Sequence, residues 1–144
     1  MKILVINGHP DPESFCQAIF QTIVSNLDTS RHEIITINLN EEDFDPVLRY
    51  GYRKRMEEDP FILRSQELIQ WADHLIFVYP IWWSSMPSLM KGWIDRVFTP
   101  GIAYSANDQG SFIWNYLRGK QFKKLFKGKT ASIYATSMAP TWWY

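Results

Sequence analysis

A histidine and a serine flank the start of a predicted helix near the N-terminus, and this arrangement is suited to holding a phosphate group. The segment reads NGHPDPESFCQA, and Ser14 stands three residues before a glutamine, which is the spacing of a capping box. The backbone N–H groups of Ser14, Phe15 and Cys16 would point at an anion, and His9 would add a donor from the loop. Two nearby carboxylates would repel a phosphate unless they point outward. A plain strand-to-helix connection is therefore the alternative.

Two adjacent tryptophans, Trp82 and Trp83, stand in a predicted connecting loop, where large apolar side chains are uncommon. A pair of aromatic rings in such a place can form the wall of a site for a flat ligand. The same pair can equally seal the core beneath the loop or contact a second subunit. Adjacent side chains in an extended segment point to opposite sides, so we expect the two rings to have different roles.

A third segment, ATSMAPTWWY, contains the end of the last predicted strand, which covers residues 130–137. It supplies the hydroxyl groups of Thr136 and Ser137 together with three further aromatic side chains. In open parallel sheets, ligands bind beside the carboxyl ends of the strands. The three segments would meet at that edge, where one suits a phosphate group and two suit a planar ring.

Several well-known site signatures are missing from the sequence. It has no glycine-rich GxGxxG segment after the first strand, no complete phosphate loop and no GxSxG elbow of a serine hydrolase. The three histidines are scattered along the chain, so no metal site is predicted. The one cysteine, Cys16, cannot form an internal disulfide, and we interpret it as a small space-filling side chain.

Length and composition favour one ordinary globular domain. The 144 residues are 46% hydrophobic and 21% charged, enough for a single core. No apolar run approaches the roughly 20 residues of a membrane span, and the N-terminus has no export signal, so we expect a cytoplasmic protein without a membrane span. The 15 basic and 15 acidic residues cancel, which argues against a broad attraction to nucleic acid.

Hydrophobic patterns predict an alternation of strands and helices. Short apolar runs at residues 3–6 and 74–80 are typical of strands covered on both faces, and the alternation at residues 35–39 suits a strand near a sheet edge. Apolar side chains at helical spacing predict one helix that begins near Phe15 and another over residues 61–73. This order is typical of an α/β fold with a parallel sheet.

The remaining connections carry further local signals. The charged segment between the second strand and the second helix predicts a loop with a short helix over residues 46–57. After the tryptophans, Ser84 or Ser85 is expected to cap a third helix. Gly92 lies inside that helix, where glycine costs about 1 kcal/mol relative to alanine, so its presence indicates close packing of another backbone.

The segments GHPDPESFCQA and YPIWWSSMPSLMKGWIDRVF, followed by GIAY, together resemble the flavodoxin-like NAD(P)H:quinone oxidoreductases. The resemblance covers residues 1–137, nearly the whole chain. It implies a flavodoxin-like α/β fold in which a parallel sheet has helices on both faces. Such a sheet has five strands, and we count four, in the expected order 2-1-3-4. We therefore expect residues 1–144 to form a single domain that is truncated at its C-terminus, and we expect a homodimer.

The resemblance assigns flavin-binding roles to all three segments. It implies phosphate binding at the first segment and contact with the isoalloxazine ring at the other two. Ser84 stands where the family often has phenylalanine, which would widen the pocket, and residues 136–138 replace a Thr-Gly-Gly segment. The implied cofactor-binding residues are His9, Ser14, Phe15, Cys16, Pro80, Ile81, Trp82, Trp83, Ser84, Thr136, Ser137 and Met138.

The resemblance also implies a reaction. Tyr104 and Ala106 would border the substrate site across a dimer interface, and Tyr144 or Trp143 falls near the position of a catalytic tyrosine. The long connection over residues 99–129 is similar to that of FAD-using members and favours FAD over FMN. The implied chemistry is hydride transfer from NAD(P)H to the flavin, followed by two-electron reduction of a quinone or similar small-molecule acceptor in a ping-pong scheme.

Two other functions stay open. A non-catalytic flavodoxin-fold regulator or partner subunit would fit the missing strand and the replaced glycines. The basic segment RGKQFKKLFKGK could bind nucleic acid, but its apolar residues Phe122, Leu125 and Phe126 are spaced as in a solvated amphipathic helix. We therefore expect no nucleic-acid partner.

Overall fold

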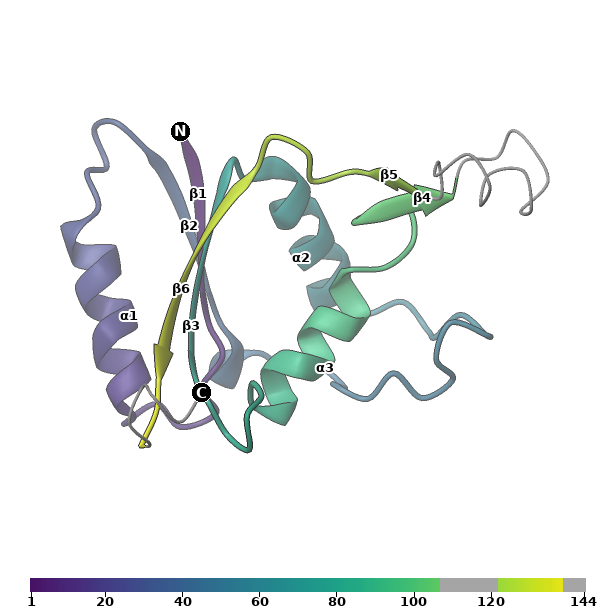
Figure 1. Ribbon diagram of the computed structural model, residues 1–144, viewed down its shortest axis with the longest axis horizontal. Helices are drawn as coiled ribbons and strands as arrows, with labels where there is room; N and C mark the ends of the chain where they lie inside the picture. Colours follow the sequence, from purple (N-terminus) through teal and green to yellow (C-terminus); the bar gives the residue numbers. More distant parts are fainter. Residues whose placement is uncertain (107–121, 139–144) are drawn as a thin grey trace.

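Four parallel strands form the central sheet in the part of the chain that the structure describes, residues 1–106 and 122–138 (Figure 1). In this computed structural model they run in the order β2, β1, β3, β6, so the predicted order 2-1-3-4 is confirmed. The carboxyl ends of all four strands therefore lie at one edge. The strands are β1 (Lys2–Asn7), β2 (Glu33–Asn38), β3 (His74–Pro80) and β6 (Thr130–Thr136), and the 3₁₀ helix η1 (Leu39–Glu41) follows β2.

Helices cover both faces of the sheet, as predicted. Helix α1 (Phe15–Asn26) lies on one face, and α2 (Pro60–Trp71) and α3 (Ser88–Val97) lie on the other (Figure 1). Alternate residues of β1 enter two separate cores, since Val5 packs with the side chains of α1 and Leu4 packs with those of α2 and α3. Burial on both faces explains why β1 is a continuous apolar run in the sequence.

The helix starts agree with the sequence patterns in one case and differ in another. Ser14 is the N-cap of α1, and its side chain accepts a hydrogen bond from the Gln17 N–H at 3.2 Å, which confirms the predicted cap. Helix α3 has Pro87 at its N-cap position and no side-chain cap. The prediction that Ser84 or Ser85 caps α3 is wrong, because both residues belong to a tight turn in the tryptophan loop.

The charged segment over residues 42–59, between η1 and α2, is called the strap below. It contains no helix, so the short helix predicted over residues 46–57 is wrong. Gly51 has a positive φ of 56°, which interrupts helical geometry, and contacts with α3 hold the preceding backbone in place. A β-carbon on Gly92 of α3 would collide with the Pro46 carbonyl oxygen. The close packing predicted at Gly92 is thus confirmed.

Arg96 of α3 is a charged residue that is buried, with only 7% of its surface exposed. Its Nη1 group donates to the Asp45 carbonyl at 2.6 Å and to the Asp59 carboxylate at 3.1 Å. Asp59 is also the N-cap of α2, because its Oδ1 atom accepts from the N–H groups of Phe61 and Ile62. One arginine therefore holds the strap near both of its ends.

Two short antiparallel strands, β4 (Tyr104–Ala106) and β5 (Phe122–Lys124), form a second, smaller sheet (Figure 1). The basic helix predicted in this region is wrong for the described residues, because β5 pairs with β4 and residues 125–128 form a turn. Phe126 packs edge-on against Phe98, with 5.3 Å between ring centroids. An aromatic contact with the end of α3 thus fixes this segment.

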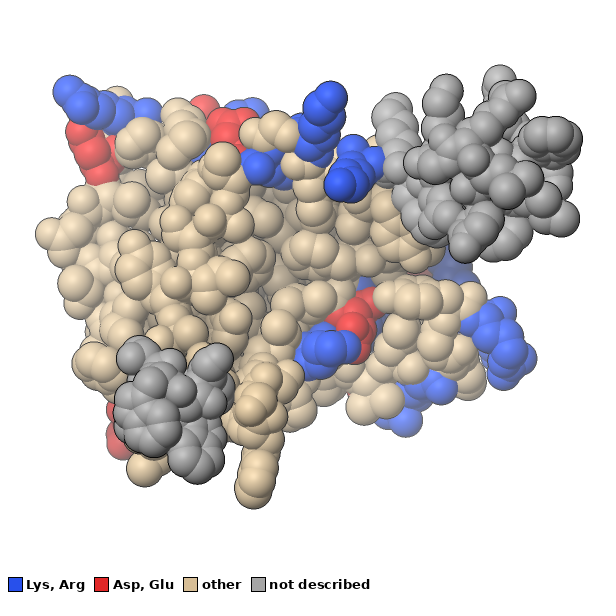
Figure 2. Space-filling view, viewed as in Figure 1, with Lys and Arg blue, Asp and Glu red and all other residues tan. Residues whose placement is uncertain are grey.

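Strand β6 lies at the outer side of the main sheet and is poorly covered. The side chains of Ile133 and Tyr134 are exposed. In Figure 2 the surface over β6 and α1 carries few charged side chains, whereas lysines and arginines lie toward β5 and the strap. No fifth strand joins this sheet within the described residues. That residues 1–144 form a single domain truncated at its C-terminus stays a prediction.

Candidate functional site

The three segments singled out in the sequence meet at the carboxyl edge of the sheet. The rings of His9 and Trp82 pack edge to face, with 5.4 Å between their centroids. The Ile81 N–H donates to the Thr136 carbonyl at 2.7 Å, and the Cys16 Sγ lies 3.2 Å from the Thr136 Oγ1. These contacts join the loop after β1, the loop after β3 and the end of β6 into one site.

A cleft with a volume of about 480 Å³ opens between these segments. Pockets for small molecules and cofactors are usually about 300–1,000 Å³, so the cleft is large enough for part of a planar ligand. Every described residue that lines it is among those expected to bind a cofactor. They are Phe15, Ile81, Trp82, Trp83, Thr136, Ser137 and Met138.

The other residues expected to bind a cofactor lie around the cleft and do not line it. His9 stands beside Trp82, Ser14 caps α1, and Cys16 is buried in the first turn of that helix. Pro80 is buried at the end of β3. Ser84 lies in the exposed turn of the tryptophan loop, so the structure brings all of these residues to one edge of the sheet.

The residues expected near the substrate are not at this cleft. Tyr104 and Ala106 belong to β4, which lies away from the carboxyl edge of the sheet (Figure 1). Tyr144 lies outside the described residues. Any contact of Tyr104 or Ala106 with such a site would have to come from a second copy of the chain.

Asn7, at the end of β1, organises the first loop and was not recognised as a functional residue in the sequence. It is fully buried, and its Nδ2 group donates to the Gln17 Oε1 at 2.6 Å and to the Asn38 Oδ1 at 3.0 Å. Its Oδ1 atom accepts from the His9 N–H at 3.2 Å. Asn7 and Asn38 are paired in register at the ends of adjacent strands. Two neighbouring strands that both end in asparagine are the signal available in the sequence.

The same loop fixes the ring of His9. The Asp11 N–H donates to the His9 Nδ1 at 3.0 Å, so this nitrogen acts as the acceptor. The neutral imidazole then carries its proton on Nε2, and that N–H group is a donor suited to an anion. The Asp11 carboxylate itself accepts from the Glu13 N–H at 2.9 Å, which ties it to its own loop. The arrangement can hold a phosphate group at the start of α1.

The tryptophan loop is a two-residue turn. Trp82 and Ser85 exchange backbone hydrogen bonds of 2.8 and 3.0 Å, and the central residues Trp83 and Ser84 have positive φ values of 51° and 59°. These values are those of a type I′ turn, which usually contains asparagine and glycine. Trp82 is directed to His9, whereas Trp83 is fully exposed. Both rings line the cleft, and neither seals the core. The segment is a tight turn and not extended, so the expectation that the two rings have different roles stays a prediction.

Replacing Ser84 with glycine should stabilise the protein by about 1 kcal/mol, because glycine adopts a positive φ without the steric penalty of a β-carbon. The free energy of unfolding in urea is the measurement. The matched control is Ser85→Gly, since Ser85 lies next to Ser84 and does not have a positive φ. This control should be neutral or destabilising. Equal effects of the two substitutions would show that the turn stores no strain.

Cys16 is the residue of the site whose pKa is shifted. Burial raises the pKa of the Cys16 thiol, and its hydrogen bond with Thr136 lowers that pKa by a smaller amount. The thiol is thus neutral near pH 7, in keeping with a space-filling role.

Within residues 1–106 and 122–138, no cluster of histidine, cysteine and acidic side chains is suited to a metal ion. The same residues include no helix that is long and apolar enough to cross a membrane.

Comparison with known proteins identifies several relatives. A ribosyldihydronicotinamide dehydrogenase [quinone] of Mus musculus is 28% identical and matches 92% of this chain and 66% of its own length. An uncharacterized NAD(P)H oxidoreductase of Haemophilus influenzae is 30% identical and matches 86% of this chain and 62% of its own length. The chain thus spans about two thirds or less of these two relatives.

A solved structure agrees with this relationship. The crystal structure of Smu.1420 from Streptococcus mutans is 36% identical, with a TM-score of 0.79, and the match covers 99% of this chain and 71% of that chain. The model of a family described by its flavodoxin-like fold matches residues 1–144. Sheet order, the three converging segments and these matches agree, and the chain belongs to the flavodoxin-like family that includes named quinone oxidoreductases.

Proposed function

We propose that this chain is a flavin-dependent oxidoreductase that passes a hydride from NAD(P)H, through a bound flavin, to a quinone or similar small acceptor. The observation that carries the proposal is the convergence of a helix N-terminus, an aromatic wall and two hydroxyl groups on one cleft of about 480 Å³. The names of the mouse and Haemophilus relatives, which refer to quinone and to NAD(P)H, support the choice of substrates.

The residues of the cleft fit a flavin in both of its parts. The N–H groups at the start of α1 and the His9 Nε2–H group would bind the phosphates. Trp82 would border the flat ring, and the hydroxyl groups of Thr136 and Ser137 would contact its polar edge. When bound, a flavin supplies the two-electron chemistry, and the protein contributes binding, orientation and electrostatic support.

The exposed Trp83 has a separate role in this proposal. Its ring lines the cleft and reaches into solvent, so it would cover the open side of the site or contact a second copy of the chain. The neighbouring Ser84 has a small side chain, which would leave this side of the cleft open. A wide opening suits a reaction in which the nicotinamide leaves before the acceptor enters, which is the ping-pong order that we propose.

The proposal extends to cofactor type and assembly. FAD is preferred to FMN because of the long connection over residues 99–129, of which residues 107–121 lie outside the described residues. A homodimer is proposed because Tyr104 and Ala106 lie away from the cleft of their own chain. In such a dimer each β4 would approach the site of the partner. Tyr144 would support charge changes on the reduced ring.

The test begins with the visible spectrum of the purified protein after addition of FAD or FMN. We expect bound flavin, and consumption of NADH or NADPH once a quinone is present. The His9→Gln variant should bind flavin about tenfold more weakly, since a hydrogen bond to a charged group contributes about 1.5–3 kcal/mol. The matched control, His32→Gln, should bind normally, because His32 lies after α1 at the far end of that helix.

The possible outcomes separate the candidate functions. A protein that binds neither FAD nor FMN would contradict the proposal. A protein that binds flavin but does not oxidise NADH or NADPH with any quinone would instead favour the non-catalytic regulator or partner subunit. Equal loss of flavin affinity in the His9 and His32 variants would show that His9 has no specific role at the phosphates.

A further inference from the structure

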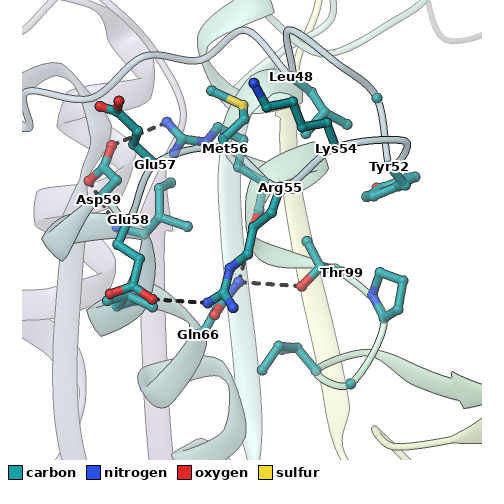
Figure 3. A pocket seen from close by; sticks show the side chains of 17 residues that line it. Leu48, Tyr52, Lys54, Arg55, Met56, Glu57, Glu58, Asp59, Gln66 and Thr99 are labelled. Carbon is teal, nitrogen blue, oxygen red and sulfur yellow. Dashed lines mark hydrogen bonds and ion pairs between the residues drawn. The ribbon is translucent and has the colours of Figure 1, made fainter.

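A second cavity lies between the strap, α2 and the turn that follows α3, and it is called the strap pocket here (Figure 3). Its volume is about 560 Å³, within the range of roughly 300–1,000 Å³ that is usual for small-molecule sites. None of its lining residues lines the cleft at the carboxyl edge. The strap pocket is thus separate from the proposed flavin site and has no role in the reaction proposed above.

One wall of the strap pocket is rigid and carries a buried positive charge. The Arg96 side chain is only 6% exposed, and its hydrogen bonds to the Asp45 carbonyl and the Asp59 carboxylate all use Nη1. Within the described part of the chain, its Nε and Nη2 groups have no hydrogen-bond partner. Asp59, in contrast, accepts from two backbone N–H groups as well as from Arg96. At this wall the Nε and Nη2 groups of Arg96 are the donors that a ligand could use, whereas the Asp59 carboxylate is already engaged.

The opposite wall belongs to the strap and can adapt. Arg55 and Glu58 form an ion pair of 3.0 Å whose side chains are 82% and 67% exposed. Figure 3 shows Arg55 extending across the pocket toward Gln66, with Glu58 held against its guanidinium group. Exposed pairs of this kind contribute little to stability, so another carboxylate can replace Glu58 at small cost.

The other charges around the pocket do not favour a cationic ligand. Lys54 is directed to the Tyr50 ring, with 4.9 Å between its ammonium group and the ring centroid. Glu57 and Glu58 are exposed, so a cation would have to bind them in water, where the interaction is weak. Asp59 balances the charge of Arg96, but the remaining N–H groups of the guanidinium are donors that match the oxygen atoms of an anion.

The rest of the lining is apolar. Side chains from the strap face side chains from α2 and from the turn after α3, so a hydrophobic body can lie between them. These side chains are Leu48, Met56, Ile62, Leu63, Pro100 and Ile102. We propose that the strap pocket binds a small amphipathic anion, with an apolar body of about two fused rings and one carboxylate or similar oxyanion directed to Arg55 and Arg96.

The experiment uses the full chain labelled with ¹⁵N and follows its amide resonances in a titration with 1-naphthylacetate. We expect shifts in the strap and in residues 99–102, and saturable binding. Arg55→Glu should weaken binding at least tenfold, because it removes the adaptable positive charge. The matched control is Arg53→Glu, which reverses a neighbouring exposed charge that does not line the pocket, and it should change the affinity less than twofold.

Two further measurements keep the interpretation specific. The Met56→Glu variant, which places a charge in the apolar wall, should also weaken binding at least tenfold. The cation 1-naphthylmethylamine has a similar ring and should bind at least tenfold more weakly than the acid. The proposal is overturned if no shifts occur, if they are confined to residues at the cleft such as Phe15 and Trp82, or if the amine binds as tightly as the acid. None of these outcomes depends on whether the chain binds flavin.

Discussion

Replacing Asp59 with alanine should lower the free energy of unfolding by about 3–5 kcal/mol, the usual cost of removing one partner from a buried ion pair. The carboxylate has two tasks, since it balances the charge of the buried Arg96 and caps α2. Its loss leaves a guanidinium group buried without its counter-charge and two backbone N–H groups without their acceptor. Urea unfolding of the purified variant measures the effect.

Two controls separate these contributions. Asp59→Asn keeps a good N-cap and removes only the negative charge, so it should lose most of the stability that the alanine variant loses. Glu58→Ala removes the neighbouring carboxylate from an exposed pair with Arg55, and it should change the unfolding free energy by no more than about 1 kcal/mol. A loss below about 1 kcal/mol for Asp59→Ala would mean that water readily reaches Arg96.

The second large effect is expected for Asn7→Leu, which has a similar size and no hydrogen-bonding groups. The substitution removes the partners of the Gln17 side chain, the Asn38 side chain and the His9 N–H. A buried polar group left unsatisfied costs about 1–3 kcal/mol. The bond to Asn38 is buried and those to Gln17 and His9 are part-buried, so the total loss should be about 3 kcal/mol. Urea unfolding measures this loss, and flavin binding should weaken in parallel because the His9 loop is released.

The matched control for Asn7→Leu is Asn26→Leu, which replaces an exposed asparagine near the end of α1. Asn26 donates to the Thr22 carbonyl at 2.8 Å, and both residues are exposed. Its replacement should stay within about 0.5 kcal/mol. If Asn7→Leu is equally mild, the polar cluster does not position the first loop, and the weaker flavin binding expected for it should also be absent.

The regular elements of the main sheet could be predicted because their patterns reflect burial directly. β1 and β3 are covered on both faces and have nearly continuous apolar runs, whereas β2 at the edge alternates. Ser14 shows the same agreement at a helix start, since the capping spacing depends only on nearby residues. A prediction from nearby residues was sufficient wherever the contact that decides the conformation lies within one or two turns of the chain.

The errors occurred where distant contacts decide the conformation. The helix expected over residues 46–57 competes with the anchoring of the strap by Gly92 and Arg96, which lie far away in the sequence. The basic helix expected near Phe126 competes with pairing between β4 and β5. The burial of Arg96 was not predicted, because a helical pattern does not show which charges are matched by a buried partner.

The segments that form the candidate site were predicted, whereas the residues that hold these segments in place were not recognised. The segments that contain His9, Trp82 and Thr136 were expected to meet, because parallel strands end at one edge, and they do. Asn7 was missed because its partners come from α1 and β2, and a single asparagine after a strand is also a common stop signal. The turn at Trp83 was missed because it lacks the asparagine and glycine that usually mark it.

The poorly covered strand β6 has a practical consequence for work with this chain. Outer strands are usually protected by charged side chains, prolines or bulges, and those features prevent strands of different molecules from pairing. β6 (Thr130–Thr136) contains no charged side chain, and Ile133 and Tyr134 are exposed on it. No strand among the described residues pairs with its outer side, so its backbone groups there offer a template for intermolecular sheet extension. Colloidal stability at high protein concentration, rather than the folding of the core, is therefore the property that this strand limits.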